Sequence, residues 1–225
     1  MANPRWNATD IIEAGKRHGI YDLQFLLQDK LEIYSALDRL GLPRAASYYF
    51  SESDLVSSWI LELFDRSAFF CRLIPKGGGI RPYREKISSI EELKEFCAEY
   101  DLAKYTGNLV ETNTVTHTGA IIATDDSMDR PGQCVVEFLE GTGPDLFHGH
   151  KTPTHVRVER FSRVLQFPNG INKKEKRLIM RALRLIGGPE NPFPGYYEFE
   201  IWKGDEIMYR NYQAPSSMYA KLTEK

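Results

Sequence analysis

The first half of the chain combines amphipathic helical patterns with short apolar runs. Residues 29–43 repeat apolar side chains at helical spacing, between a capping Asp29 and the helix-ending Gly41. Residues 51–65 and 88–100 show the same spacing, and the latter opens on a capping box. Helices are therefore predicted for these three segments. Strands are predicted for residues 45–50 and 67–74.

From about residue 107 the pattern changes to strands. One long helix is predicted over residues 171–188, which open on a capping box and close on two glycines. Residues 195–202 and 206–213 alternate around a Lys-Gly-Asp turn and predict an antiparallel hairpin. Further strands are predicted for residues 107–115, 119–125, 134–141, 154–161 and 163–167.

These elements predict an α+β protein of two lobes with mixed or antiparallel sheets and covering helices. The chain has 225 residues and shows no internal repeat or low-complexity linker. We expect an N-terminal helical segment over residues 1–28, an N-terminal lobe over residues 29–106 and a C-terminal lobe over residues 107–225.

Composition narrows the possible partners. The formal charge is −2, which argues against a protein that coats nucleic acid, so any basic site must be local. The three cysteines form no CxxC pair, and neither a zinc knuckle nor a disulfide framework is indicated. No segment approaches the about 20 apolar residues that span a bilayer. We expect a cytoplasmic protein that does not bind membranes.

Residues 69–86 gather basic side chains around a triple glycine. Gly77, Gly78 and Gly79 have no side chains, so their backbone can approach phosphates closely. The alternative is a mobile hairpin with a solvated basic rim. Arg72 lies within an apolar strand, where it needs an anionic partner, either an internal carboxylate or a phosphate. The basic side chains are Arg72, Lys76, Arg81, Arg84 and Lys86.

An acidic pair occurs in the predicted C-terminal hairpin. Glu198 and Glu200 alternate with apolar residues, so both carboxylates lie on the same face of the strand. Mg²⁺ between them would relieve their repulsion, with Asn211 or Gln213 as a neutral oxygen ligand. The alternative is a solvent-facing strand with each acid near a lysine.

Histidines and arginines between residues 148 and 160 are open to two interpretations. His148, His150 and His155 could bind zinc, although a surface loop fits them as well. Arg157 and Arg160 are either anion contacts or members of intrastrand salt bridges.

In this order the motifs resemble the ATP-grasp fold, and within it the ATP-binding domain of the phosphoenolpyruvate synthase and pyruvate phosphate dikinase group. Residues 29–50 resemble that group's opening, where a lysine precedes a helix that ends in a Gly-Leu-Pro turn. Residues 67–79 resemble its strand with a phosphate-contacting basic residue and a glycine-rich loop. Residues 135–153 resemble its hinge, and residues 196–215 its closing hairpin.

The resemblance implies two lobes that enclose a cleft for Mg·ATP. Lys30 and Arg72 would contact the phosphates and act in catalysis, and Lys76 with the glycines would close over them. The hinge would bind adenine, and the hairpin would bind the metal. The implied hinge residues are Glu137, Phe138 and Leu139, and the implied metal ligands are Glu198, Glu200 and Gln213.

The implied function is transfer of a phosphoryl group from ATP to an acid substrate or to a histidine of a partner, as a phosphotransferase or ligase. The acceptor is a small molecule or a protein, and a homo-oligomer is compatible with the sequence. A non-catalytic ATP-binding regulatory or interaction module is the alternative. A nucleic-acid-binding module is a third hypothesis, and the formal charge of −2 argues against it.

Overall fold

The computed structural model describes residues 30–124, 133–147, 150–159 and 164–215. The chain divides into two compact units, a small unit of Ala45–Thr114 and a large unit formed by Met1–Arg44 with Val115–Lys225. The lobe boundary expected at residue 107 falls inside strand β4, and the expected helical segment 1–28 lies outside the described residues.

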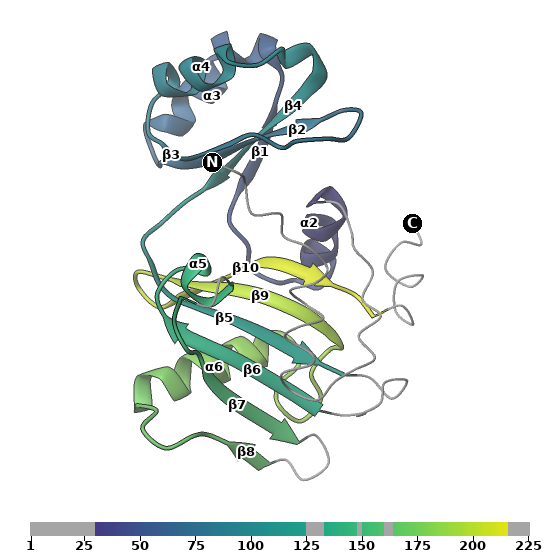
Figure 1. The fold of residues 1–225 in the computed structure, drawn as a ribbon, viewed down its shortest axis with the longest axis vertical. Coiled ribbons are helices and arrows are strands. Elements are labelled where there is room, and N and C mark those ends of the chain that lie inside the picture. Colours follow the sequence, from purple (N-terminus) through teal and green to yellow (C-terminus); the bar gives the residue numbers. More distant parts are fainter. Residues whose placement is uncertain (1–29, 125–132, 148–149, 160–163, 216–225) are drawn as a thin grey trace. The chain divides into compact units, whose positions relative to one another are not determined.

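The small unit is a four-stranded antiparallel sheet in the order β1-β4-β2-β3, with two helices packed on one face (Figure 1). Phe69, Cys71 and Leu73 alternate along β2 and are buried against these helices. The elements are β1 (Ser47–Phe50), η1 (Glu52–Val56), α3 (Ser58–Phe64), β2 (Phe69–Pro75), β3 (Tyr83–Ile87), α4 (Ile90–Ala98), η2 (Leu102–Lys104) and β4 (Tyr105–Glu111).

Two predictions for the small unit need correction. The helix predicted over residues 51–65 is interrupted at Ser57, which has an extended backbone (φ −82°, ψ 144°). Strand β3 was not predicted, because its sequence Tyr-Arg-Glu-Lys-Ile offers only one buried side chain, Ile87. Its pairing with β2 makes the basic, glycine-rich stretch the turn of a hairpin.

The large unit is a six-stranded antiparallel sheet in the order β10-β9-β5-β6-β7-β8. Helix α6 packs on one face of the sheet and the short α5 lies on the other (Figure 1). The strand predicted over residues 107–115 is divided between β4 and β5, which belong to different units. The elements are α2 (Lys30–Arg39), β5 (Val115–Ala123), β6 (Gln133–Glu140), α5 (Gly143–Phe147), β7 (Thr154–Glu159), β8 (Val164–Gln166), α6 (Lys173–Leu185), β9 (Gly195–Trp202) and β10 (Glu206–Gln213).

Helices α2 and α6 share the main core of the large unit. Ile33 and Leu37 of α2 and Leu178 and Leu183 of α6 are almost fully buried in one cluster with side chains of the sheet. The segment after α2 is tied to the last strand by the Tyr209 amide, which donates to the Pro43 carbonyl at 2.8 Å. The predicted α+β class with antiparallel sheets is confirmed.

Candidate functional site

One face of the small sheet carries polar side chains and is turned away from α3 and α4. Arg72 alternates with the buried residues of β2, and it pairs in register with Asn108 on β4, which in turn pairs with Tyr49 on β1. The Arg72 guanidinium is half-buried and lies 5.1 Å from the centre of the Phe70 ring. An arginine over an aromatic face is stabilised by the ring quadrupole, and its edge still presents N–H donors.

Asn108 was not singled out by sequence reasoning. Its side chain is only 1% exposed, and its Nδ2 has no hydrogen-bond partner. A buried donor without an acceptor costs about 1–3 kcal/mol, so such a group marks a place where a ligand can contribute the missing partner. Arg72 and Asn108 together offer donors to an anion from adjacent strands. The apolar residues Leu109 and Val110 directly after this asparagine are the sequence signal that could have identified it as a buried polar residue.

The glycine-rich loop is the exposed turn between β2 and β3. Gly78 (φ 79°) and Gly79 (φ 121°) adopt left-handed backbone conformations that other residues rarely adopt. Lys76 donates from Nζ to the Ala103 carbonyl at 3.0 Å, which holds the base of the loop against η2. A backbone close to solvent fits both an anion-binding flap and a solvated hairpin.

The basic side chains of this region do not gather at one point. Arg84 lies on the helix-covered face of the small sheet, where it pairs with Glu99 at 2.9 Å and stacks over Phe96 at 5.2 Å. Arg84 pairs in register with Cys71, so these two residues share a face of the sheet. Arg72 is the next residue of β2 and therefore lies on the opposite face. Arg72 therefore lies beside Asn108, whereas Arg84 lies on the other face of the sheet.

An acidic face, defined here by Glu137, Glu198 and Glu200, covers part of the large sheet opposite α6. Tyr197, Phe199 and Ile201 are fully buried in the core, so the two glutamates of β9 point to the other side, as their alternation predicts. The strand registers place one row of residues across five strands. This row runs Asn211, Glu198, Ala120, Glu137 and His155.

Each carboxylate of the acidic face has a neighbour. Glu200 accepts from Trp202 Nε1 at 3.4 Å and lies 3.6 Å from Arg210 Nε. Glu198 accepts from the Tyr196 hydroxyl at 3.1 Å, and Glu137 lies 3.8 Å from His155 Nδ1. Arginine, and not the lysine of the sequence-based alternative, is therefore the basic neighbour of Glu200.

Two amide oxygens on β10 have no hydrogen-bond partner. Asn211 Oδ1 and Gln213 Oε1 are both buried, and the Gln213 residue is only 3% exposed. Asn211 pairs in register with Glu198, and Gln213 with Tyr196 two residues before it. A buried oxygen acceptor is stabilised by a donor or by a cation, and carboxylate with amide oxygens is the ligand set that Mg²⁺ and Ca²⁺ prefer. The residues present therefore fit a divalent cation.

The described residues contain no group of three or more His, Cys, Asp or Glu side chains placed to hold a metal. A cation site on the acidic face would consequently depend on the amide oxygens as well as on the carboxylates. Of the three histidines, His150 is exposed, His155 lies beside Glu137, and His148 is outside the described residues.

The residues expected to bind adenine lie in strand β6. Glu137 and Phe138 are paired with β5 on one side and β7 on the other, so their backbone groups lie within ladders. Phe138 is fully buried and stacks on His117, with ring centres 5.1 Å apart. Leu139 lies beyond the end of the β7 pairing and is paired on the β5 side. The sequence did not predict that Glu137 contributes its carboxylate to the acidic face.

Lys30 is the first residue of α2, which belongs to the large unit, whereas Arg72 belongs to the small unit. His117 lies on β5, between the two strands that carry the acidic face, and its ring is turned to the α6 side, where burial lowers the pKa of its imidazole. We therefore leave His117 out of the candidate site.

No family model and no curated protein sequence matches the chain. Solved structures similar to it include D-alanyl-alanine synthetase A from Vibrio cholerae (7% identity, TM-score 0.44, covering 79% of this chain and 52% of that one). N5-carboxyaminoimidazole synthetase from Staphylococcus aureus, complexed with ADP, is similar at 11% identity and TM-score 0.43 (82% and 44%). The ATP-grasp ligase PsnB, complexed with a precursor peptide and AMPPNP, is similar at 12% and 0.39 (82% and 48%).

The chain spans about half the length of these proteins. PsnB is described as an ATP-grasp ligase, the fold that the order of motifs resembles. Every one of these TM-scores is below 0.5. Among the helices of the described residues, none is long and apolar enough to cross a membrane.

Proposed function

We propose that the chain binds Mg·ATP and promotes transfer of its terminal phosphoryl group. The observation that carries this proposal is the pair of buried, unpartnered amide oxygens beside the acidic pair of β9. The unpartnered Asn108 donor beside Arg72 is a second observation, of opposite polarity. The amide oxygens of Asn211 and Gln213 would be stabilised by a cation, and the Asn108 amide donor would be stabilised by an anion. A metal ion and a phosphate group are the two charged parts of a metal–nucleotide complex.

In this proposal the large unit supplies the metal ligands. Glu198 and Glu200 provide negative charge, and Asn211 and Gln213 provide neutral oxygens. The bound ion would neutralise phosphate charge as it develops during transfer. Glu137 adds a third carboxylate to the same row, on the other side of Ala120 in the strand register.

The small unit supplies phosphate donors in this proposal. Arg72 and Asn108 donate to phosphate oxygens, and the backbone of Gly77–Gly79 closes over them. Lys30 and Lys76 add positive charge. Leu139, whose backbone lies beyond the β7 ladder, is the hinge residue best placed to contact adenine.

Phosphoryl transfer requires alignment and charge neutralisation more than covalent participation by the protein. An acceptor carboxylate or histidine nitrogen would form a bond to the terminal phosphorus as the bond to ADP breaks. A carboxylate acceptor makes the chain ligase-like, because an acyl phosphate is then ready for attack by a nucleophile. A histidine acceptor is what the resemblance to the phosphoenolpyruvate synthase group implies.

A non-catalytic nucleotide-binding module is the second candidate, and one contact favours it. Arg210 lies at the β-bulge of β10, and its guanidinium is 3.6 Å from Glu200. A cation from the protein itself thus already neutralises one of the two carboxylates. Under this second hypothesis the Arg210 guanidinium occupies the position of a metal ion beside Glu200, and the chain binds a nucleotide without hydrolysing it or transferring its phosphoryl group.

Thermal unfolding with and without Mg·ATP tests the proposal. The wild type should be stabilised, and Arg72→Ala should lose most of that stabilisation. Lys94→Ala, on the exposed side of α4, is the matched control and should respond as the wild type does. An equal response of Arg72→Ala and wild type would refute the role of Arg72. ATP consumption by protein that binds nucleotide then separates catalysis from the non-catalytic version.

A further inference from the structure

Helix α6 has a strongly basic outer surface. Leu178, Ile179, Ala182 and Leu183 are fully buried against the sheet, so the remaining arc of the helix faces outward. All six basic residues of the helix are exposed, and its one acid, Glu175, is held in the N-terminal capping box. We call these six residues the basic stripe: Lys173, Lys174, Lys176, Arg177, Arg181 and Arg184.

Part of the basic stripe has a structural role. Asp205, in the turn between β9 and β10, accepts from Lys174 at 2.9 Å and from Arg177 at 3.3 Å. Arg181 donates to the Asp205 carbonyl at 2.9 Å. These contacts anchor α6 to the hairpin. One carboxylate among three cations leaves net positive charge on this side of the helix.

The outermost cations of the stripe have no acidic neighbour. In the part of the chain that the structure describes, no carboxylate lies within 4.0 Å of Lys173 or Arg184, or of Lys176, which lies over the Phe167 ring at 5.3 Å. At about 100° per residue, Lys173, Arg177 and Arg184 fall within about 40° of one another around the helix axis. Eleven residues at about 1.5 Å each place the ends of this line about 16 Å apart.

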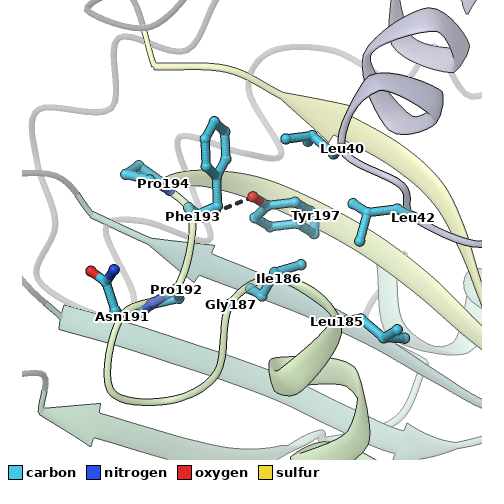
Figure 2. A pocket seen from close by; sticks show the side chains of 10 residues that line it. All are labelled: Leu40, Leu42, Leu185, Ile186, Gly187, Asn191, Pro192, Phe193, Pro194 and Tyr197. Carbon is cyan, nitrogen blue, oxygen red and sulfur yellow. Dashed lines mark hydrogen bonds between the residues drawn. The ribbon is translucent and has the colours of Figure 1, made fainter.

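An apolar pocket lies at the C-terminal end of the same helix (Figure 2). Its volume is about 320 Å³, and Leu185 and Ile186 directly follow the last cation of the stripe. The loop after α6 contributes Pro192 and Phe193, and the end of α2 contributes Leu40. Leu185, one of the lining residues, is 41% exposed. A row of cations therefore leads to an apolar recess within one unit.

We propose that the basic stripe and this pocket form a docking surface for an acidic peptide segment of a partner protein, anchored by one apolar or aromatic side chain. Charge complementarity selects the acidic segment, and the pocket accepts the anchor, as buried aromatic anchors do at the centres of protein interfaces. About five residues of extended peptide span 16 Å. The apolar pocket favours a peptide over a nucleic acid, because a nucleic acid has no apolar side chain to place in the recess.

This surface does not depend on the proposed nucleotide site. The pocket is lined by Tyr197 from the α6 side of β9, whereas Glu198 and Glu200 lie on the other face of the same strand. The two proposals can therefore fail separately.

The probe is a fluorescein-labelled peptide of five glutamates followed by tryptophan, titrated with the full chain and followed by fluorescence anisotropy. We expect saturable binding that weakens at high salt and becomes at least tenfold weaker when alanine replaces the tryptophan. Lys173→Glu/Arg184→Gln should weaken binding about tenfold or more, because the variant loses two positive charges of the basic stripe. Neither residue contacts Asp205, so the contacts that anchor α6 to the hairpin remain. Leu185→Ser tests the pocket and should weaken the tryptophan peptide but not the alanine peptide.

Lys94→Glu on α4 of the small unit is the matched charge-reversal control, and circular dichroism verifies that every variant is folded. Equal affinity for the wild type and Lys173→Glu/Arg184→Gln, or no binding of the tryptophan peptide, would overturn the proposal. Tighter binding of a single-stranded DNA hexamer than of the peptide would also overturn it and would assign the stripe to nucleic acid.

Discussion

Replacing Gln213 by methionine should make the ligand-free protein more stable and the nucleotide-bound protein less so. Gln213 is 3% exposed and its Oε1 has no hydrogen-bond partner. Such an acceptor costs about 1–3 kcal/mol relative to a satisfied one. Methionine is unbranched, similar in length and without a polar oxygen, so Gln213→Met should remove that cost without leaving a cavity.

The expected gain in the free energy of unfolding is about 1 kcal/mol, because part of the benefit is lost in repacking. For a chain of this size that corresponds to about 2–4 °C in Tm. The wild type should gain about 2.7 kcal/mol from Mg·ATP at a concentration of about 100 times Kd. A variant that has lost a metal ligand should gain far less, so the order of stability reverses when Mg·ATP is added.

Urea unfolding with and without Mg·ATP measures both effects. Gln166→Met is the matched control, because Gln166 is exposed on β8 in the same unit and its replacement should change stability by less than about 0.5 kcal/mol. A Gln213→Met variant that is less stable than the wild type by more than about 1 kcal/mol without ligand, and that keeps the full Mg·ATP stabilisation, would contradict this prediction. Its oxygen would then be neither a strained acceptor nor a ligand.

Two further predictions concern packing and thiol chemistry. Gly107→Ala should lower the free energy of unfolding by about 1–3 kcal/mol in urea, because a Cβ at this position would overlap the Phe50 ring. Gly77→Ala in the open loop should have little effect. Equal stability of the two variants would contradict this prediction. Burial raises the pKa of the Cys97 thiol to about 11, so the thiolate forms more readily in the unfolded chain. The contribution of the Cys97 thiol to stability should therefore be constant below about pH 8 and be lost as the pH rises toward 11, so that the decline in stability over this range should be smaller in Cys97→Ala. Rapid labelling of Cys97 in the native protein at pH 8 would argue against its burial.

Local signals in the sequence located much of the fold. The predicted capping box at Asn172 is present at the start of α6. At the start of α4 the Ser89 hydroxyl caps the helix as predicted, but the Glu92 carboxylate accepts from the amide of Ser88, the residue before that cap. The alternation around Glu198 correctly placed both glutamates of β9 opposite the core. These features depend on residues only a few positions apart, so the sequence displays them directly.

Features that depend on pairing between distant strands could not be predicted in this way. Glu137 lies beside His155, and Asn108 beside Arg72, only because of the registers of β6 with β7 and of β4 with β2. Nothing within either strand specifies its neighbour's register. Strand β3 escaped prediction for a related reason: a charged edge strand is identified by its partner and not by its own apolar pattern.

The central claim is that the chain binds a metal–nucleotide complex. Isothermal titration calorimetry with a non-hydrolysable ATP analogue, with Mg²⁺ and then with EDTA, tests it most directly. We predict one binding site per chain in Mg²⁺ and affinity at least tenfold weaker in EDTA. The reason is that the carboxylates of the acidic face and the amide oxygens of Asn211 and Gln213 would contact the nucleotide only through the bound ion. No binding at millimolar analogue, or equal affinity in Mg²⁺ and EDTA, would contradict the account.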